Sequence, residues 1–398
     1  MAKHRHILFL NGNNASVSWL AVGMISEVIV ELEKGGFSTV EKFLDDNQDQ
    51  YVFGYFSYDL KNDLELLESK HTNHTNLPVA HFFVPVHLAQ VSGKDLKVIK
   101  GSESVLQQTY SELNQQIDSP TLFAGEINFT LTRQQYLDKI LQVKNHIQQG
   151  DIYEANFCYE VFAENVDIQP SGVYQKLNKQ TEAPFSVYGQ LYDNHILSAS
   201  PERFIKRVGD KVTSQPIKGT IKRGASTEED NELIAFLEHN PKDRSENVMI
   251  VDLVRNDLSK IANPKSVEVE ELCKIYTFKN IHQMISTVNA RVEGVKSIEV
   301  IKALFPMGSM TGAPKIRAMQ LMEELEESKR GLYSGCIGYF APNGDFDFNV
   351  VIRTIIYNET EKKLSFSVGG AITDLSLPEL EYEETLLKAE ALIQALTR

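Results

Sequence analysis

The sequence is poor in the features that support several large classes of protein. Three cysteines occur in 398 residues, and they form neither a CxxC pair nor a spacing typical of zinc ligands. A small, odd number of isolated cysteines predicts a reduced, cytoplasmic protein. The chain has no apolar run near the ~18 residues of a membrane span. Its N-terminus has no cleavage-type site, so we expect neither a membrane segment nor a signal peptide.

Two further absences concern ligands. The sequence contains no Gly-x-Gly-x-x-Gly fingerprint and no P-loop, so a nucleotide-binding fold is not predicted. Lys and Arg number 40 against 54 Asp and Glu, which gives a net charge of −14. We do not expect so acidic a chain to bind nucleic acid. An anionic substrate would need a local cluster of cations or a bound metal ion.

What remains is a chain of ordinary globular composition, with 42% apolar residues and enough length for one large or two ordinary domains. Consecutive alternating segments favour an α+β fold with largely antiparallel sheet. The pattern changes near residue 120, which divides a strand-rich portion (1–120) from a second portion (121–398). The predicted strands include His6–Leu10, Tyr51–Ser57, Val79–Val84, Phe185–Leu191 and Asp347–Tyr357, and the predicted helices include Thr132–Gln149, Thr227–His239, Arg244–Ile261 and Pro378–Thr397.

Two predicted helices carry acid pairs at i, i+3. Asp243 and Glu246 open the first, and Glu246 lies on its apolar face; Glu381 and Glu384 lie in a C-terminal helix that is apolar nearly all round. Carboxylates on apolar faces are costly unless they are paired or bind a cation. Two such pairs would form an all-oxygen site, which suits Mg²⁺. Helix capping by the first pair, and a Glu384–Lys388 ion pair in the second, are the alternatives.

A lysine stands in the segment Pro216-Ile217-Lys218-Gly219-Thr220, and Glu202 precedes it by sixteen residues. A possible nucleophile, an acid and a metal-binding set of carboxylates together indicate an enzyme. Further along, Gly308–Lys315 is rich in small residues and leads into a predicted helix. We expect Pro314 in its first turn and Thr311 or Gly312 as its cap, with N–H groups open to an anion.

Two other residues have weaker signals. Arg353 lies in the predicted strand Asp347–Tyr357, on the face of Val351 and Ile355. A solvated arginine is the commoner case, and a clamp on a carboxylate is the functional alternative. A lone histidine such as His282 is more often structural than functional.

These stretches resemble the chorismate-utilising enzymes, a family that includes anthranilate, aminodeoxychorismate, isochorismate and salicylate synthases. The resemblance spans about residues 125–398 and is weak before residue 120, where Phe53–Leu60 is similar to a strand of the aminodeoxychorismate branch. It implies antiparallel sheets packed face to face with helices outside. The matching segments are Gly150–Phe157, Ser200–Phe204, Pro216–Thr220, Asp243–Leu258, Gly308–Arg317, Tyr333–Phe340, Val351–Thr354, Gly369–Asp374 and Glu381–Lys388.

The resemblance also implies roles for single residues. Lys218 would attack C2 of chorismate, and Glu202 would protonate the hydroxyl leaving C4, where ammonia then adds. Because a lysine must be neutral to attack, we expect burial or a nearby cation to lower its pKa. Mg²⁺ would be bound by Glu246 and Glu384 directly. The other implied residues are Asp243 and Glu381 (metal, through water), Tyr333 and Arg353 (pyruvyl carboxylate), and Gly219, Thr220, His282, Thr311, Gly369, Gly370 and Lys388 (pocket lining).

Position 218 distinguishes branches of the family. Anthranilate synthases typically have alanine there and aminodeoxychorismate synthases lysine, so the resemblance favours formation of 4-amino-4-deoxychorismate, the precursor of 4-aminobenzoate and folate. The cysteines lack a Gly-x-Cys-x-Gly context, so ammonia from glutamine would require a separate amidotransferase subunit. An anthranilate synthase large subunit and a non-catalytic regulatory subunit are the alternatives.

The chain departs from the family pattern at two positions. Glu154 stands where the ammonia-using branches usually have glutamine and the hydrolytic relatives have a lysine base. An acid there argues against isochorismate or salicylate chemistry, and it would pair with Lys218 and change its basicity. Ala371 replaces a common glycine and is expected to tighten the pocket near the ring carboxylate.

Overall fold

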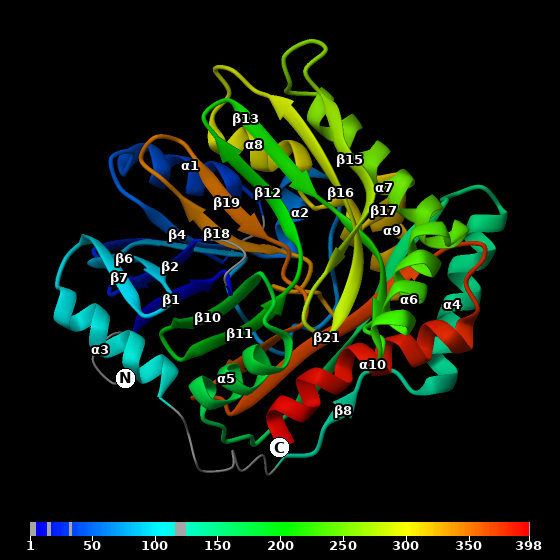
Figure 1. Ribbon diagram of the computed structural model, residues 1–398, viewed down its shortest axis with the longest axis horizontal. Coiled ribbons are helices and arrows are strands. Elements are labelled where there is room, and N and C mark those ends of the chain that lie inside the picture. Colours follow the sequence, from blue (N-terminus) through cyan, green and yellow to red (C-terminus); the bar gives the residue numbers. More distant parts are fainter. Residues whose placement is uncertain (1–4, 14–16, 32–33, 116–124, 398) are drawn as a thin grey trace.

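Two large antiparallel sheets form the centre of the molecule in a computed structural model that describes residues 5–13, 17–31, 34–115 and 125–397 (Figure 1). In the order of its strands, the first sheet comprises β17 (Gly312–Ala313), β9 (Glu154–Ala163), β21 (Lys363–Ile372), β20 (Thr354–Asn358), β11 (Asn194–Ser200), β10 (Phe185–Leu191), β1 (His6–Asn11), β2 (Ser18–Val22), β6 (His87–Ser92) and β7 (Asp95–Lys100), with β8 (Asn128–Phe129) on β9.

The second sheet carries the strands that extend to the top of Figure 1. Its order is β14 (Ile217–Lys222), β16 (Ile281–Arg291), β13 (Lys211–Gln215), β12 (Arg203–Val208), β19 (Phe346–Asn349), β18 (Cys336–Phe340), β4 (Val52–Phe56), β5 (Ala80–Val84) and β3 (Ser26–Val30), with β15 (Glu268–Thr277) on β16. The expectation of an α+β fold with antiparallel sheets is confirmed.

Helices cover the outer faces of both sheets. They are α1 (Gly36–Asp46), α2 (Lys61–Leu64), α3 (Glu103–Asn114), α4 (Arg133–Gln148), α5 (Pro170–Thr181), α6 (Thr227–His239), α7 (Pro241–Ser259), α8 (Ser297–Leu304), α9 (Lys315–Leu325) and α10 (Pro378–Thr397), with short 3-10 turns η1 (Tyr58–Leu60) and η2 (Gly308–Met310). Both α6 and α10 have the predicted bounds. In the described ranges, no helix is long and apolar enough to cross a membrane.

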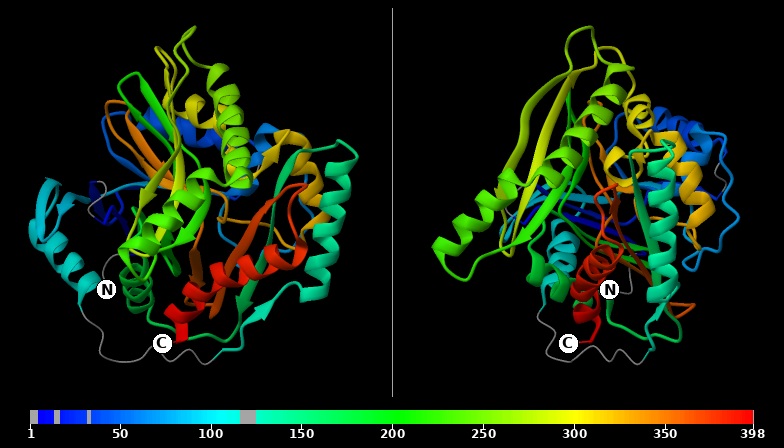
Figure 2. Two further views of the ribbon diagram at one scale, coloured as in Figure 1. Left: turned by 45° about the vertical axis from the view of Figure 1, so that its right-hand side comes forward. Right: turned by 90° about the vertical axis from the view of Figure 1, so that its right-hand side faces the viewer.

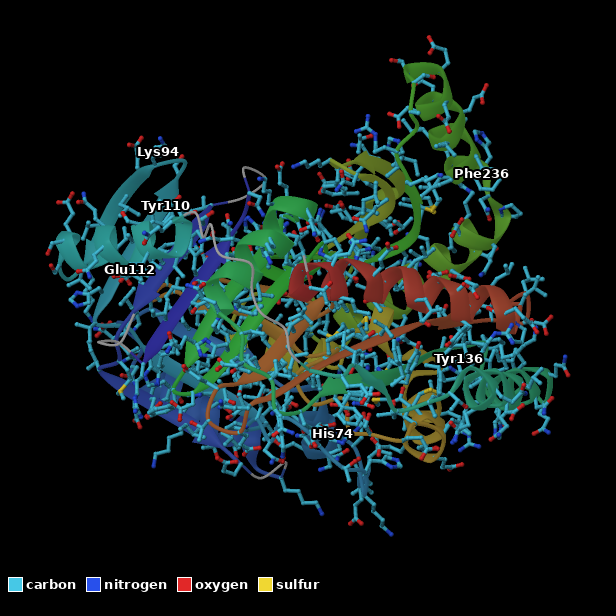
Figure 3. All side chains as sticks on the ribbon, turned by 90° about the horizontal axis from the view of Figure 1, so that it is seen from below. His74, Lys94, Tyr110, Glu112, Tyr136 and Phe236 are labelled. Carbon is cyan, nitrogen blue, oxygen red and sulfur yellow. The ribbon has the colours of Figure 1, made fainter. Side chains whose placement is uncertain are left out.

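The three largest buried apolar clusters hold these layers together. The first contains apolar side chains of α4, α5, α9 and α10 against one sheet, and the second those of α1, α7 and α8 against the other. The third lies between the sheets and includes Trp19, Tyr55 and Val351. On the outer side Tyr136 of α4 packs against Tyr382 of α10, with ring centroids 5.4 Å apart, and Figures 2 and 3 show these two helices close together. Burial of apolar area is the main driving force for this assembly.

The sequence division near residue 120 falls outside the described residues. On either side of it, the two portions of the chain contribute to both sheets. β1 pairs with β10 in the first sheet, and β4 pairs with β18 in the second. The portions 1–120 and 121–398 therefore share their hydrogen-bonded core, while their division into domains stays a prediction.

The predicted strand Asp347–Tyr357 is wrong as a single element. The chain forms β19 in the second sheet, crosses between the sheets, and forms β20 in the first. Arg353 lies at the crossing with φ +50°, a left-handed conformation that breaks the strand alternation. A continuous apolar run does not show where a chain changes sheets, because both halves of the run are buried.

Candidate active site

The side chain of Lys218 lies buried next to the first sheet. Its Nζ donates a hydrogen bond of 2.6 Å to Glu154 Oε1, at the start of β9. β14 has a register shift between Ile217 and Thr220, and Gly219 within it has φ +89°. That conformation favours glycine, so the Lys-Gly-Thr sequence permits the irregularity at which the lysine lies.

The surroundings of Lys218 reverse the expected shift of its pKa. Burial lowers the pKa, but the carboxylates of Glu154, Glu246 and Glu202 outweigh burial and raise it overall. The expectation of a lowered pKa is therefore wrong for this structure. Nearby anions stabilise the ammonium form, and only the tertiary structure brings three of them together around one lysine.

Glu202 follows β11 and is buried beside the loop that contains η2. Burial raises the pKa of its carboxyl to about 7, against the lowering effects of a hydrogen bond with Ser309, the charge of Lys218 and the backbone N–H of Ile217. A substantial fraction of Glu202 therefore carries a proton near neutral pH. A buried carboxyl with such a pKa is suited to general acid catalysis.

The four acids predicted to bind metal lie on α7 and α10. Glu246 is buried, its Oε1 has no hydrogen-bond partner among the described residues, and burial raises its pKa to about 7. Burial also raises the pKa of Asp243. Burial also tends to raise the pKa of Glu384. The ammonium of Lys388, whose Nζ lies 2.7 Å from Glu384 Oε1, outweighs this effect and lowers the pKa overall.

A lysine bridges the two helices at this point. Lys242 Nζ lies 3.0 Å from Glu381 Oε1 and 3.8 Å from Glu246 Oε1. Within the described ranges, these acids do not form a group whose ligand atoms all lie within metal-binding reach of one another. Their oxygen-only chemistry, the unpartnered oxygen of Glu246 and its raised pKa nevertheless fit a divalent cation.

Glycines allow the backbone to approach closely around this site. A Cβ on Gly312 (φ +146°) would lie 2.2 Å from the carbonyl oxygen of Glu154, so glycine is required where β17 meets β9. A Cβ on Gly370 would meet Glu381 Oε2 at 3.6 Å and Lys388 Nζ at 3.8 Å. Lys388 also donates to the carbonyl oxygen of Gly369 at 2.8 Å. The predicted residues Gly369, Gly370 and Lys388 thus lie together with the acids of α10.

Arg353 and Tyr333 are both partly buried. The guanidinium of Arg353 has no ion pair or hydrogen bond to a residue in the described parts of the chain, and burial lowers its pKa. Burial raises the pKa of Tyr333, whose hydroxyl interacts with Asn156. Withdrawing a guanidinium from water without a counter-ion is costly, which favours binding of an anion from outside the chain.

Thr311, another predicted pocket residue, forms hydrogen bonds within its own loop. The Thr311 hydroxyl donates to the carbonyl oxygens of Met307 and Gly308, at 3.2 and 3.3 Å. It does not cap α9, which starts at Lys315 with Pro314 in the N-cap position and no side-chain cap. The expected placement of Pro314 within the helix, and of Thr311 or Gly312 as the cap, was therefore wrong.

His282 lies near the start of β16, the strand that follows β15. Its Nδ1 and Nε2 lie 2.9 Å from the Thr277 hydroxyl and 2.8 Å from Asp230 Oδ1 of α6.

The next residue, Gln283, was not predicted from the sequence. Its Nε2 donates to the hydroxyl of Thr220 at 3.4 Å, and its buried Oε1 has no partner among described residues. Because β16 also contains His282, Ser286, Thr287 and Asn289, its sequence gives no signal that singles out Gln283.

Arg330 was also not predicted from the sequence, and its hydrogen bonds hold together segments next to the site. Its guanidinium donates to Glu326 and to the carbonyl oxygens of Asn156 and Met310, at 2.6–3.0 Å. It lies 4.5 Å from the ring centroid of Tyr58, in the segment that precedes α2. Arg330 therefore links the N-terminal portion to the strand that carries Glu154.

Comparison with known proteins agrees with this architecture. Aminodeoxychorismate synthase, chloroplastic, of Arabidopsis thaliana is 41% identical over 265 residues, which cover 65% of this chain and 28% of that protein. Aminodeoxychorismate synthase component 1 of Bacillus subtilis is 32% identical over 362 residues, covering 87% of this chain and 76% of that protein. The chain thus spans under a third of the plant relative and about three quarters of the bacterial one.

The solved structure of anthranilate synthase component I from Streptococcus pneumoniae superposes with a TM-score of 0.81 at 25% identity, covering 94% of this chain and 92% of that one. The family model of the chorismate binding enzymes matches residues 10–394, which is nearly the whole sequence. On these grounds the chain belongs to the family of chorismate-binding enzymes.

Proposed function

We propose that this chain converts chorismate and ammonia into 4-amino-4-deoxychorismate, as the component I of an aminodeoxychorismate synthase. The observation that carries the proposal is the buried Lys218, within hydrogen-bond distance of Glu154 and in the electrostatic field of Glu202. A lysine so placed provides a nucleophile and a nearby proton acceptor. The relatives named aminodeoxychorismate synthase support the same assignment.

In the first step, Lys218 Nζ forms a bond to C2 of chorismate, the ring double bonds shift, and the C4–oxygen bond breaks. Glu202 gives its proton to the departing hydroxyl, which leaves as water. Before it attacks, the ammonium of Lys218 gives one proton to Glu154 Oε1, 2.6 Å from Nζ; the nitrogen bonded to C2 is then a secondary ammonium.

In the second step, ammonia forms a bond to C4, the double bonds shift back, and the C2–nitrogen bond breaks to release Lys218. The lysine leaves as a neutral amine and takes its proton back from Glu154, while the new ammonium at C4 gives one proton to Glu202. The net change replaces the C4 hydroxyl by an amino group and produces one water. Throughout, the Arg353 guanidinium binds the pyruvyl carboxylate, with Tyr333 beside it. Arg353 is suited to this role because it has no carboxylate partner of its own among the described residues.

The acids of α7 and α10 would hold Mg²⁺, with Glu246 and Glu384 as direct ligands and Asp243 and Glu381 acting through water. When bound, the ion would supply the positive charge that neutralises the ring carboxylate of chorismate. Lys242 now lies between Glu246 and Glu381, so its ammonium would move aside on metal binding. The observation in favour of this site is the buried Oε1 of Glu246, which accepts no hydrogen bond from the described residues and has only Lys242, at 3.8 Å, as an ion-pair partner there.

Ammonia would come from a separate glutamine amidotransferase subunit. The three cysteines of the chain are buried, and burial raises the pKa of each thiol, which is the opposite of what a nucleophilic cysteine needs. Formation of 4-aminobenzoate from the product would require a further lyase.

Two other functions remain to be tested against this proposal. Lys218 distinguishes the site from that of an anthranilate synthase, in which a small residue is expected at this position. A non-catalytic subunit would have no need of an arginine that lacks an ion pair among the described residues, nor of a proton-bearing Glu202 beside a buried lysine.

Mass spectrometry of the products separates these functions. The protein is incubated with chorismate, Mg²⁺ and ammonium, and we expect an amino product that keeps the pyruvyl group and becomes 4-aminobenzoate when a lyase is added. Fluorescent anthranilate with released pyruvate would assign the chain to the tryptophan branch. Unchanged chorismate would favour a non-catalytic, regulatory subunit.

A further inference from the structure

Away from the candidate active site, two histidines and a glutamate from three strands converge on one point. His6 Nε2 lies 2.9 Å, and His81 Nε2 lies 2.8 Å, from the same oxygen, Oε2 of Glu27. His6 starts β1 in the first sheet, whereas Glu27 and His81 lie on β3 and β5 of the second. We call these three residues the His–Glu–His cluster.

Aromatic rings enclose the cluster. His6 and His81 are each 3% exposed. The ring of Tyr192 lies 4.6 Å from that of His6 and 6.2 Å from that of His81, centroid to centroid. The hydroxyl of Tyr192 donates to Oε1 of Glu27, the oxygen that the histidines do not use. The carboxylate is therefore fixed in orientation, with Oε2 directed at both imidazoles.

The three ligand atoms lie within metal-binding reach of one another, and they are the one such group of three that the described residues contain. Two imidazole nitrogens and one carboxylate oxygen are typical of sites for Zn²⁺ and similar divalent transition metals. Mg²⁺ prefers oxygen ligands and an octahedral shell. Tyr192 corresponds to the outer hydrogen-bond partner that commonly holds a metal-bound carboxylate in place.

A pocket lies beside His81, on one side of the cluster. His81 and Tyr192 line a pocket of about 230 Å³ together with Tyr55 and Glu31. The hydroxyl of Tyr55 is buried there and has no hydrogen-bond partner in the described part of the chain. A site with three protein ligands leaves a fourth position for water, and this pocket provides both the space and an unpartnered hydroxyl for it.

We propose that His6, Glu27 and His81 bind one divalent transition-metal ion of the Zn²⁺ class, and that the ion links the first sheet to the second at this end of the molecule. Both Nε2 atoms would bind the metal in their unprotonated form, with the ring protons on Nδ1. For each neutral imidazole this requires only that the ring proton lie on Nδ1 and not on Nε2, so that the Nε2 lone pair points at the metal and not at Glu27. Stability rises with metal concentration, because the three ligands converge only in the folded chain.

The test uses the full-length protein freed of metal by a chelator and titrated with Co²⁺, then with Zn²⁺. We expect one equivalent of Co²⁺ with the visible absorption of a four-coordinate site, displaced by Zn²⁺, and a higher Tm with either ion. Tyr192→Phe should weaken binding by about 10–100-fold. His81→Ala and Glu27→Gln should abolish the Co²⁺ spectrum.

The control is His146→Ala, which removes a histidine–carboxylate pair elsewhere on the chain, 2.7 Å from Asp151; it should bind Co²⁺ like the unchanged protein. Glu27→Gln keeps the size of the side chain, so a variant that folds but binds no metal remains informative. If the unchanged protein gives no Co²⁺ spectrum, or if all variants bind equally, the cluster is a hydrogen-bonded link without metal and the proposal is wrong.

Discussion

Lys218 of the second sheet donates a hydrogen bond of 2.6 Å to Glu154 of the first, and both side chains are buried. The proposed nucleophile is thus paired with an acid across the junction of the two sheets. Removing one partner of a buried ion pair leaves an uncompensated charge, which costs about 3–5 kcal/mol. We therefore expect changes to this pair to affect both folding and the proposed chemistry.

The first prediction concerns Lys218→Ala. We expect the variant to lose 4-amino-4-deoxychorismate formation by several orders of magnitude, because it removes the nucleophile. It should also lose stability, since Glu154 becomes an unpaired buried carboxylate. Product mass spectrometry and denaturant unfolding measure the two effects.

The double variant Lys218→Ala with Glu154→Gln separates catalysis from folding. It removes both charges, so most of the lost stability should return while activity should not. Full activity of either variant with ammonia would contradict the covalent role of Lys218.

The second prediction concerns Glu154→Gln alone. Among the charges that raise the pKa of Lys218, Glu154 has the largest effect. Without this carboxylate the lysine should lose its proton more readily, and the acidic limb of the kcat/KM profile for chorismate should move down by about 1–3 pH units. An unmoved limb would mean that the pair is already broken when chorismate reaches the enzyme. Glu327→Gln, which removes an exposed partner of Lys139, is the control.

The third prediction is a dependence of stability on pH in the absence of Mg²⁺. The carboxyls of Glu202 and Glu246 have pKa values raised by burial from 4.5 to about 7. Between these values the folded chain binds more protons than the unfolded chain, so its stability falls as the pH rises. Each group accounts for about 3 kcal/mol of this loss, and the loss is complete above pH ~7.

Urea unfolding at pH 5 and pH 8 measures this dependence. Glu202→Gln and Glu246→Gln should each remove one carboxyl group's contribution to the change in unfolding free energy between these pH values. Mg²⁺ should stabilise the unchanged protein at pH 8 more than the Glu246→Gln variant. A stability that rises across the same window would show that other groups dominate.

The fourth prediction concerns Arg353. Its guanidinium has no partner of its own in the described ranges, so we expect it to bind a substrate carboxylate through a fork of two hydrogen bonds. Arg353→Lys keeps the charge but not the fork. We expect KM for chorismate to rise roughly 10- to 150-fold, equivalent to about 1.5–3 kcal/mol for a hydrogen bond between charged groups.

The matched control is Arg255→Lys, since Arg255 forms an exposed ion pair with Asp252 and should leave KM unchanged. A normal KM with a lowered kcat in Arg353→Lys would instead indicate that Arg353 acts in the transition state alone.

A fifth prediction concerns Gly312. A Cβ at this position would lie 2.2 Å from the carbonyl oxygen of Glu154, and φ of +146° disfavours any other residue. Gly312→Ala should therefore lower the Tm and displace Glu154 from Lys218, with a loss of activity in proportion. Gly150→Ala is the control, because a Cβ there meets no atom within 4 Å, although its φ of +83° is also positive. Equal losses in the two variants would show that φ, and not the contact with Glu154, decides the effect.

The sequence by itself determined much of the local structure and the family. Apolar periodicity predicted α6 and α10 with their observed bounds, because helix formation depends on residues three and four positions apart. The order of the motifs from Gly150 to Lys388 led to the chorismate-binding enzymes. The two acid pairs could also be assigned to helices, since their spacing places both members of each pair on one side.

The tertiary structure alone decided which charges share a low-dielectric space. Glu154 and Lys218 are 64 residues apart, so the pKa of the lysine depends on a contact that no local pattern contains. Arg353 lies where the chain leaves one sheet for the other, a position hidden within an apolar run. His6 and His81 meet on Glu27 across separations of 21 and 54 residues. Each of these contacts depends on how strands from distant parts of the chain pair and pack, and the burial that results sets their electrostatics.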